Sequence, residues 1–317
     1  MKRQYILLTL LLSMALNITA QIVDYQPLVR DGVRWVNYEI TDRNWDHFEV
    51  ILYSFEFHGE TVVFPDDNTA PIHYHKIYLK KLYSFDLYDF DDDNVSDSVA
   101  NVVNLQSEDG SLGMECGFLV EHNQVIYKTS WTFSSMKEFE ANRIVLYDFS
   151  PDASLMVSEL GGLELHSIPF FDMIDVNGKS CRRYIHPEYD YLRFVESVGY
   201  DGPYLGSLLE PNPINNRWTS WRSQGLSCQL DKNENVIYKG SCYSIYYSLM
   251  HSLSDVDNDG KVDVGDVNTT INTILGKANK EKADINGDRT IDIADINSML
   301  NIILKPSKRK HWYITEL

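Results

Sequence analysis

Two stretches near the end of the chain carry oxygen-bearing side chains at a spacing that can surround a hard cation. In the first stretch, positions 1, 3, 5, 9 and 12 of a loop are Asp255, Asp257, Asp259, Asp263 and Asp266. The same positions recur 29 residues later as Asp284, Asn286, Asp288, Asp292 and Asp295. Position 7, which contributes a backbone carbonyl in such loops, is Lys261 in the first stretch and Thr290 in the second. This pattern predicts two Ca²⁺ sites with these twelve residues as ligands.

The two predicted sites differ in their turn and in their charge. Position 6 needs a sharp turn, and it is Gly260 in the first loop but Arg289 in the second. A side chain at this position makes a positive φ costlier, by about 1 kcal/mol. Asn286 also stands where the first loop has a carboxylate. We therefore expect the second site to bind Ca²⁺ more weakly.

Each predicted loop leads into a short amphipathic helix. In the first helix, the apolar residues at a spacing of three or four are Val264, Val267, Ile271 and Ile274, and Gly276 is placed to end it. In the second helix they are Ile293, Ile296, Leu300 and Ile303, and Pro306 follows. Two such short helices are unstable alone, so we expect the two apolar stripes to pack together and folding to depend on calcium.

A duplicated loop–helix unit that lacks the entering helix of a full EF-hand, closed by Asp at position 12, resembles the type I dockerin. The resemblance covers residues 255–304 and implies calcium-dependent folding. It also implies docking to a cohesin domain on the scaffold of a polysaccharide-degrading complex. The family commonly carries hydroxyl residues at loop positions 10 and 11, where this chain has Val264-Gly265 and Ile293-Ala294. A cohesin-like partner and an intramolecular partner both remain open.

The larger part of the chain, residues 21–248, reads as antiparallel strands. Short runs rich in Val, Ile, Tyr, Phe and Trp are separated by clusters of Asp, Asn, Gly and Pro. The clearest runs are 33–40, 48–57, 76–83, 117–127, 143–149 and 236–247. Helical periodicity is nearly absent apart from a possible turn at 134–141. We predict a mainly β fold, an antiparallel sandwich or open barrel, with a small all-α calcium-binding domain at 249–306 and a basic, aromatic tail at 307–317.

Several segments of this β region resemble a group of uncharacterised secreted bacterial proteins. The matching segments are 27–35 (PLVRDGVRW), 146–150 (LYDFS), 194–199 (FVESVG) and 208–211 (LLEP). Proteins of this group often end in a calcium-binding repeat pair. The resemblance implies a fold and export from the cell, and it implies no reaction.

The first twenty residues are typical of a cleaved secretory signal. Lys2 and Arg3 precede an apolar run at 6–16, and Ala20 is a small residue at the expected cleavage site. No later stretch approaches the length that spans a bilayer, so we expect a secreted, extracellular or cell-surface protein that is not transmembrane after cleavage. The formal net charge of −18 argues against a nucleic-acid partner.

The chain, which we expect to be exported, contains four cysteines, Cys116, Cys181, Cys228 and Cys242. Three disulfide pairings are possible. Cys228 and Cys242 flank an expected hairpin turn at 231–235, which makes them the better candidate pair. Buried free thiols are the alternative.

Other motifs carry weaker signals. His73 and His75 could place two imidazoles on one strand face, but no third metal ligand is in register. Asp89, Asp91 and Asp93 begin like a calcium loop, yet position 12 is Ala100, so a solvated acidic loop is the simpler interpretation. Trp218 and Trp221 could form a platform for glycan stacking or could lie in the core.

Catalytic residues cannot be nominated from the sequence. It contains no G-x-S-x-G or H-E-x-x-H motif and no phosphate-cradling glycine loop. We expect a non-catalytic β domain with a calcium module for attachment or stabilisation. The alternative is a dockerin-bearing component of polysaccharide catabolism, either a glycoside hydrolase or a carbohydrate-binding subunit.

Overall fold

The structure is a computed structural model. It describes residues 24–44, 47–62, 72–88, 98–105, 113–129, 135–150, 154–158, 165–189, 192–202, 222–259, 261–278, 281–286 and 290–304. The predicted signal at 1–20, the tail at 307–317 and the motifs at 89–93, 208–211 and 218–221 lie outside these residues.

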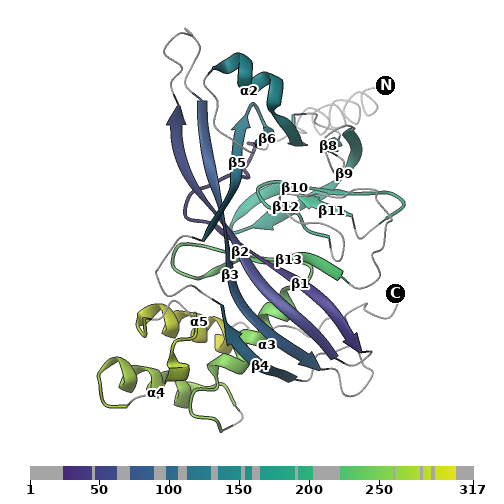
Figure 1. Cartoon of the computed structure of the whole chain (residues 1–317). Coiled ribbons are helices and arrows are strands. Elements are labelled where there is room, and N and C mark those ends of the chain that lie inside the picture. Colours follow the sequence, from purple (N-terminus) through teal and green to yellow (C-terminus); the bar gives the residue numbers. More distant parts are fainter. Residues whose placement is uncertain are drawn as a thin grey trace, which may run out of the picture.

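Fourteen strands in the described part of the chain form one antiparallel sheet (Figure 1). They are β1 (Arg34–Asn44), β2 (His47–Val62), β3 (Ile72–Tyr88), β4 (Ser98–Asn104), β5 (Met114–His122), β6 (Val125–Thr129), β7 (Ile144–Asp148), β8 (Ser154–Ser158), β9 (Leu165–Val176), β10 (Lys179–Ile185), β11 (Arg193–Val195), β12 (Gly199–Tyr200), β13 (Arg222–Leu230) and β14 (Val236–Lys239). Their order is β12-β11-β10-β9-β8-β7-β6-β5-β3-β2-β1-β13-β14, and β4 pairs with β3. The prediction of a mainly β fold is confirmed, and the strands form a single curved sheet.

The described helices gather mostly at the end of the chain. They are α2 (Met136–Asn142), α3 (Tyr243–Ser254), α4 (Val264–Ile274), the 3-10 helix η1 (Glu281–Ala283) and α5 (Ile293–Leu304). The predicted turn at 134–141 corresponds to α2. The prediction of a strand over 236–247 is wrong beyond Lys239, because α3 begins at Tyr243. Tyr243, Tyr246, Leu249 and Met250 are buried at helical spacing, which a count of β-favouring residue types does not detect.

The central strands bury side chains on both of their faces. Trp35, Phe55 and Ile77 lie in one buried cluster, here called core 1, together with the aromatic residues of β7, β10 and β11. On the opposite face, Val36 and Leu52 lie in a second cluster, here called core 2, together with Tyr83 and residues of α3 and α5. Trp35 and Val36 are neighbours in one strand, so successive side chains of β1 point into different cores.

A β-bulge in β3 and another in β13 allow each of these strands to contribute side chains to both cores. In β3, pairing with β2 moves from Lys81 opposite Tyr53 to Tyr83 opposite Leu52, which leaves Leu82 as an extra residue. In β13, pairing with β1 moves in the same way and leaves Ser227 as the extra residue. One extra residue reverses the alternation of side chains between the two faces. Apolar residues on either side of each bulge therefore face opposite cores.

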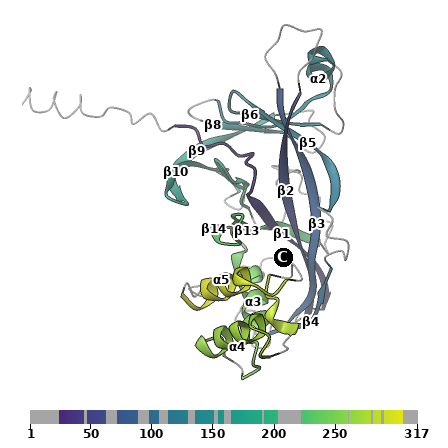
Figure 2. The same ribbon diagram turned by 90° about the vertical axis from the view of Figure 1, so that its left-hand side faces the viewer.

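Core 1 is closed by the curl of the sheet itself, which bends back so that β9 and β10 lie on the same side of β2 and β3 as β13 and β14 (Figure 2). The indole Nε1 of Trp35 donates to the carbonyl of Val198 at 3.0 Å. The buried amide of Gln229 donates to the carbonyl of Ser197 at 3.1 Å. These side-chain hydrogen bonds join strands that are far apart in the ladder order.

The described segments that carry the resemblance to secreted bacterial proteins converge in core 1. Trp35 comes from the first segment, Tyr147 and Phe149 from the second, and Phe194 and Val198 from the third, and all five are buried. Tyr147 and Phe149 stack with ring centroids 5.9 Å apart. These segments therefore contribute buried side chains to core 1, which is a structural role.

Asp201, which follows β12, joins the two ends of the sheet through a second set of hydrogen bonds. This buried carboxylate accepts hydrogen bonds from the hydroxyl of Tyr238 at 2.7 Å and from the backbone N–H of Ser241 at 2.9 Å.

The substitution Asp201→Ala leaves both donors without their acceptor, so we expect a loss of about 2 kcal/mol or more in the free energy of unfolding. Urea unfolding measures it. Glu140→Ala, at an exposed position of α2, is the control, and equal unfolding midpoints for the two variants would contradict the role of Asp201.

Candidate calcium site

The first predicted calcium loop begins directly where α3 ends. Asp255, position 1 of the loop, is the C-cap residue of α3, and α4 begins at Val264. A helix therefore flanks this loop on each side, and the expectation that an entering helix is lacking is wrong for the first repeat. Before the second loop the corresponding element is the three-residue helix η1.

The first three carboxylates of this loop converge. One ligand oxygen each from Asp255, Asp257 and Asp259 lie within 4.8 Å of one another. The backbone N–H of Asp259 donates to Oδ1 of Asp255 and to Oδ1 of Asp257, both at 3.1 Å. The N–H of Lys261 donates to Oδ1 of Asp259 at 2.9 Å. These contacts turn the three side chains toward the middle of the loop, and an all-oxygen set of this kind suits Ca²⁺.

Position 12 holds the backbone of the first loop together. The carboxylate of Asp266 is buried, and its Oδ1 accepts from the N–H groups of Val256 at 2.7 Å and of Asp257 at 3.2 Å. Its Oδ2 accepts from the N–H of Asp263 at 2.9 Å. Asp263 in turn accepts from the N–H of Gly265 at 2.7 Å and caps α4. The reciprocal pair forms a capping box, so the loop and the start of α4 order one another.

The second repeat makes the same three contacts. Asp295 is buried, and it accepts from the N–H groups of Ile285 at 2.7 Å, Asn286 at 3.1 Å and Asp292 at 2.8 Å. Burial raises the pKa of the Asp295 carboxyl to about 6. A buried carboxylate of this kind is stabilised by a cation, so the donor set fits a bound metal ion.

Parts of the predicted ligand set lie outside the described residues. The ligand Asp288 lies outside them, and so do the two position-6 residues of the turns, Gly260 and Arg289. Asp284 and Asn286 are partly buried, and Thr290 is exposed. The relative strength of the two sites stays a prediction.

The predicted pairing of the two apolar stripes is only partly right: Ile296 is buried in core 2 and Val267 and Ile303 pack against it, but the other residues do not follow. Val264 and Ile293 are 65% and 66% exposed, and Ile271 and Ile274 are also exposed. The buried positions of α4 are Asp266 and Thr270, and those of α5 are Asp295, Ile296, Ser298, Met299 and Ile302. The position-12 carboxylates must face their loops, and this rotates each helix away from the face that hydropathy alone selects. The predicted end of α4 is confirmed, because Gly276 follows it with a φ of +67°.

The calcium-loop module shares core 2 with the sheet. Position 2 of each loop, Val256 and Ile285, is fully buried there, as are Ala283 and Met299. The hydroxyl of Tyr83 in β3 donates to the carbonyl of Ile285 at 3.4 Å. Figures 1 and 2 show α3 and α5 beside the lower part of the sheet, with α4 farther away.

The other predicted sites give different outcomes. Cys228 and Cys242 are not bonded, and all four thiols are free. Cys228 lies opposite Lys239 in the hairpin, whereas Cys242 lies beyond the hairpin and donates its thiol hydrogen to the hydroxyl of Tyr38 at 3.1 Å.

The histidine motif of β3 is not part of a metal site in the described residues. The Nε2 of His75 lies 3.5 Å from Oδ1 of Asp31. Among the described residues, the acidic cluster at 255–259 is the group with metal-ligand geometry, and it does not include His75.

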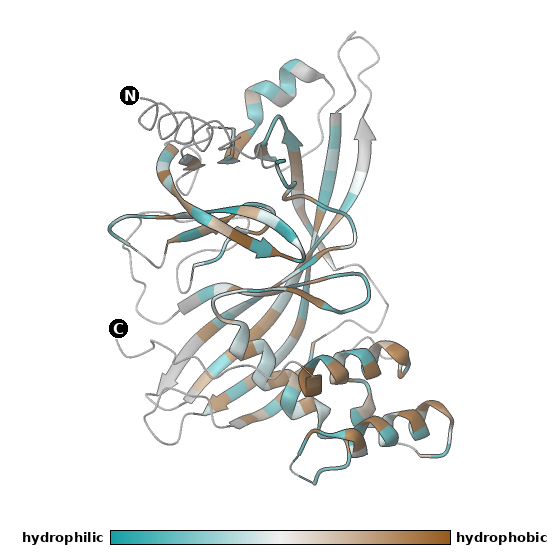
Figure 3. Ribbon diagram, turned by 180° about the vertical axis from the view of Figure 1, so that it is seen from behind, coloured by the Kyte–Doolittle hydropathy of each residue, from teal (hydrophilic) through white to brown (hydrophobic). Residues whose placement is uncertain are grey.

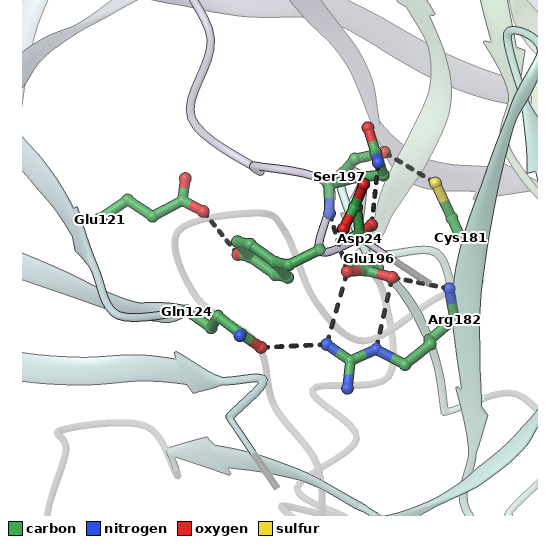
Figure 4. Close-up of polar contacts among 9 residues, drawn as sticks. Asp24, Glu121, Gln124, Cys181, Arg182, Glu196 and Ser197 are labelled. Atoms are coloured by element: carbon green, nitrogen blue, oxygen red, sulfur yellow. Dashed lines mark hydrogen bonds and ion pairs between the residues drawn. The ribbon is translucent and has the colours of Figure 1, made fainter. Parts of the chain in front are cut away.

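Two carboxylates outside the module, the partly buried Glu121 and the fully buried Glu196, anchor the first described residues (Figure 4). Glu121 accepts from the hydroxyl of Tyr25 at 2.5 Å and from the N–H of Val29 at 2.8 Å, and burial raises its pKa. Glu196 accepts from the N–H of Gln26 at 2.9 Å. Sequence reasoning did not single out these two residues, because their roles depend on contacts distant in the chain. Their oxygens hold residues 25–29 against the sheet.

Comparison with known proteins identifies the module. Residues 253–304 match the Dockerin type I domain family, so this part of the chain is a type I dockerin domain. Dockerin domains bind calcium, and the acidic cluster of the first loop is compatible with that property. The matched residues begin within α3 and end at the last residue of α5.

No curated protein and no solved structure matches the chain. In the described residues, every helix is too short or too polar to cross a membrane.

We predict that Asp266→Ala and Asp295→Ala together abolish the response of the chain to calcium. Each substitution removes a proposed ligand and the acceptor of three backbone N–H groups. Saturating calcium should raise the unfolding midpoint of the wild-type protein, because a hundredfold excess over Kd adds about 2.7 kcal/mol per site to the free energy of unfolding. The midpoint of the double variant should not change. Thermal unfolding in calcium and in EDTA measures this. Asp175→Ala, at an exposed position near the end of β9, is the control, and an unchanged wild-type midpoint after chelation would refute the prediction.

Proposed function

We propose that this chain is a secreted bacterial protein whose dockerin domain attaches the β region to a cohesin-type partner through the exposed face of α4. The observation that carries this proposal is the unequal exposure of two equivalent helices. In α4, Ile271 and Ile274 are 37% and 40% exposed, whereas their counterparts in α5, Leu300 and Ile303, are partly buried. In α5, Ile296, Met299 and Ile302 are buried against α3 and the sheet.

The exposed face of α4 has a composition that suits an apolar partner surface. Figure 3 shows hydrophobic residues along both helices of the module. Asn268 and Asn272 are exposed on α4, so amide groups accompany the apolar side chains. Interfaces of this kind gain affinity from a few apolar anchors surrounded by polar groups. Loop positions 10 and 11, Val264-Gly265, extend the apolar character to the start of the helix.

The proposal includes two Ca²⁺ ions. The proposed ligands of the first are Asp255, Asp257, Asp259, Lys261, Asp263 and Asp266, and those of the second are Asp284, Asn286, Asp288, Thr290, Asp292 and Asp295. Position 7 contributes a backbone carbonyl in each loop. Export by the segment at 1–20 would place these sites outside the cell, where calcium is abundant enough for loops of moderate affinity.

Glycan recognition by the β region is the second candidate function. Phe170 and Phe171 on β9 are exposed, and the guanidinium of Arg183 lies 5.4 Å from the centroid of the Phe171 ring. Asp172 holds Arg183 through two hydrogen bonds at 2.7 and 2.6 Å. An exposed aromatic ring beside fixed polar groups is suited to stacking against a sugar. This arrangement supports a carbohydrate-binding subunit of a polysaccharide-degrading complex.

The docking proposal predicts that Ile271→Asp with Ile274→Asp weakens binding to cohesin domains at least about tenfold, because charge is introduced into the apolar contact. Isothermal titration against a panel of bacterial cohesin domains, in saturating calcium, measures it. The matched control is Val103→Asp, at an exposed apolar position of β4. Absence of binding between the wild-type chain and every cohesin of the panel would contradict the proposal.

The glycan proposal predicts that the wild-type chain binds a member of an array of plant, host and microbial polysaccharides. Phe171→Ala should then reduce the signal about tenfold or more through loss of stacking. Leu165→Ala, at another exposed apolar position of β9, should not. No signal from the wild-type chain across the array would exclude this second function.

A further inference from the structure

We infer that the β region supplies the entering helix of the first calcium loop, so that calcium holds core 2 of the sheet closed. This inference concerns the stability of the β region and does not depend on a cohesin partner. It rests on the continuity of α3 with the loop, on the residues that α3 covers, and on the charge of the loop.

The first observation is that α3 runs directly into the first calcium loop, with no linker residues between them. Ser254 is the last residue of α3 and is fully buried, and Asp255 follows it as the first calcium ligand position. Val256 is fully buried in core 2, and its N–H donates to Oδ1 of Asp266. The loop therefore fixes the end of α3 to the start of α4 through a buried carboxylate. A twelve-residue helix is marginal in water by itself, so the position of α3 depends on these anchors.

The second observation is the packing of α3 on the sheet. Tyr243, Tyr246 and Leu249 are buried in core 2 against the face of β1 and β13. Cys228 of β13 is fully buried in the same cluster as Tyr243 and Tyr246. Cys242 is the N-cap residue of α3, and its thiol donates to the hydroxyl of Tyr38 in β1. The helix thus covers two thiols that are distant from the calcium ligands in sequence.

The third observation is the charge of the loop. Five carboxylates lie between positions 255 and 266, and Lys261 is the one basic residue of that stretch. Like charges at this spacing repel one another unless a cation neutralises them. Chelation therefore favours opening of the loop, and opening withdraws Val256 from core 2 and releases the end of α3. Core 1 lies on the opposite face and contains none of the described residues of the calcium module, so it should stay closed.

Thiol labelling tests the inference on the full mature chain. The probe is a maleimide applied in a short pulse under mild reducing conditions, in saturating calcium and in EDTA, with peptide mass spectrometry of each cysteine. We expect chelation to raise the labelling rates of Cys228 and Cys242 by at least about tenfold, through local opening. Cys181 is fully buried in core 1, and its rate should change less than about twofold. Unchanged rates at Cys228 and Cys242, or an equal rise at Cys181, would overturn the inference.

A variant of one proposed calcium ligand distinguishes the effect of calcium binding from a general loss of folding. Asp257 is exposed at loop position 3, so Asp257→Ala removes a ligand without leaving a cavity. Protection of Cys228 and Cys242 in this variant should require about tenfold or more additional calcium, and excess calcium should restore it. Asp175→Ala is the control outside the loops. A calcium requirement equal to that of the wild-type chain, or protection that excess calcium fails to restore, would overturn the role of the first loop.

Discussion

The central strands bury apolar side chains on both of their faces, and each face needs its own cover. Core 1 is covered by the curl of the sheet, which the hydrogen bonds of Trp35 and Asp201 secure. On the opposite face, the part of the chain that the structure describes offers no further strands, and core 2 is covered by α3 and by the dockerin domain. An uncovered face of this size would be costly in water, so the place of the dockerin domain follows from the sheet.

A covering element made from calcium loops has stability that depends on its ions. Carboxylates crowded into one loop repel one another, while the buried residues beside them, Val256 and Ile285, belong to the shared core. Ions that bind the folded state alone stabilise every contact that folds with the loops. Attachment to a partner and integrity of the β region are therefore coupled in this chain, which has no linker between α3 and the first loop.

The two repeats are similar in sequence and occupy different environments. Thr270 of α4 corresponds to Met299 of α5, and both positions are fully buried. Thr273 corresponds to Ile302, and only the isoleucine reaches core 2. The helix with the apolar side chains packs on α3, whereas the helix with the threonines packs on α5 and η1 and leaves Ile271 and Ile274 exposed. One half of the duplicated module serves the fold, and the other half remains available for a partner.

Local patterns in the chain were sufficient to predict strands over most of the β region, the two helices that follow the calcium loops, and the dockerin resemblance. Ligand spacing and caps such as Gly276 act over a few residues, so they can be read directly. The buried faces of α4 and α5, the helical state of Tyr243 and the free state of Cys228 required the three-dimensional arrangement. The bulges at Leu82 and Ser227 assign side chains to a face, and partners distant in sequence decide which face is covered.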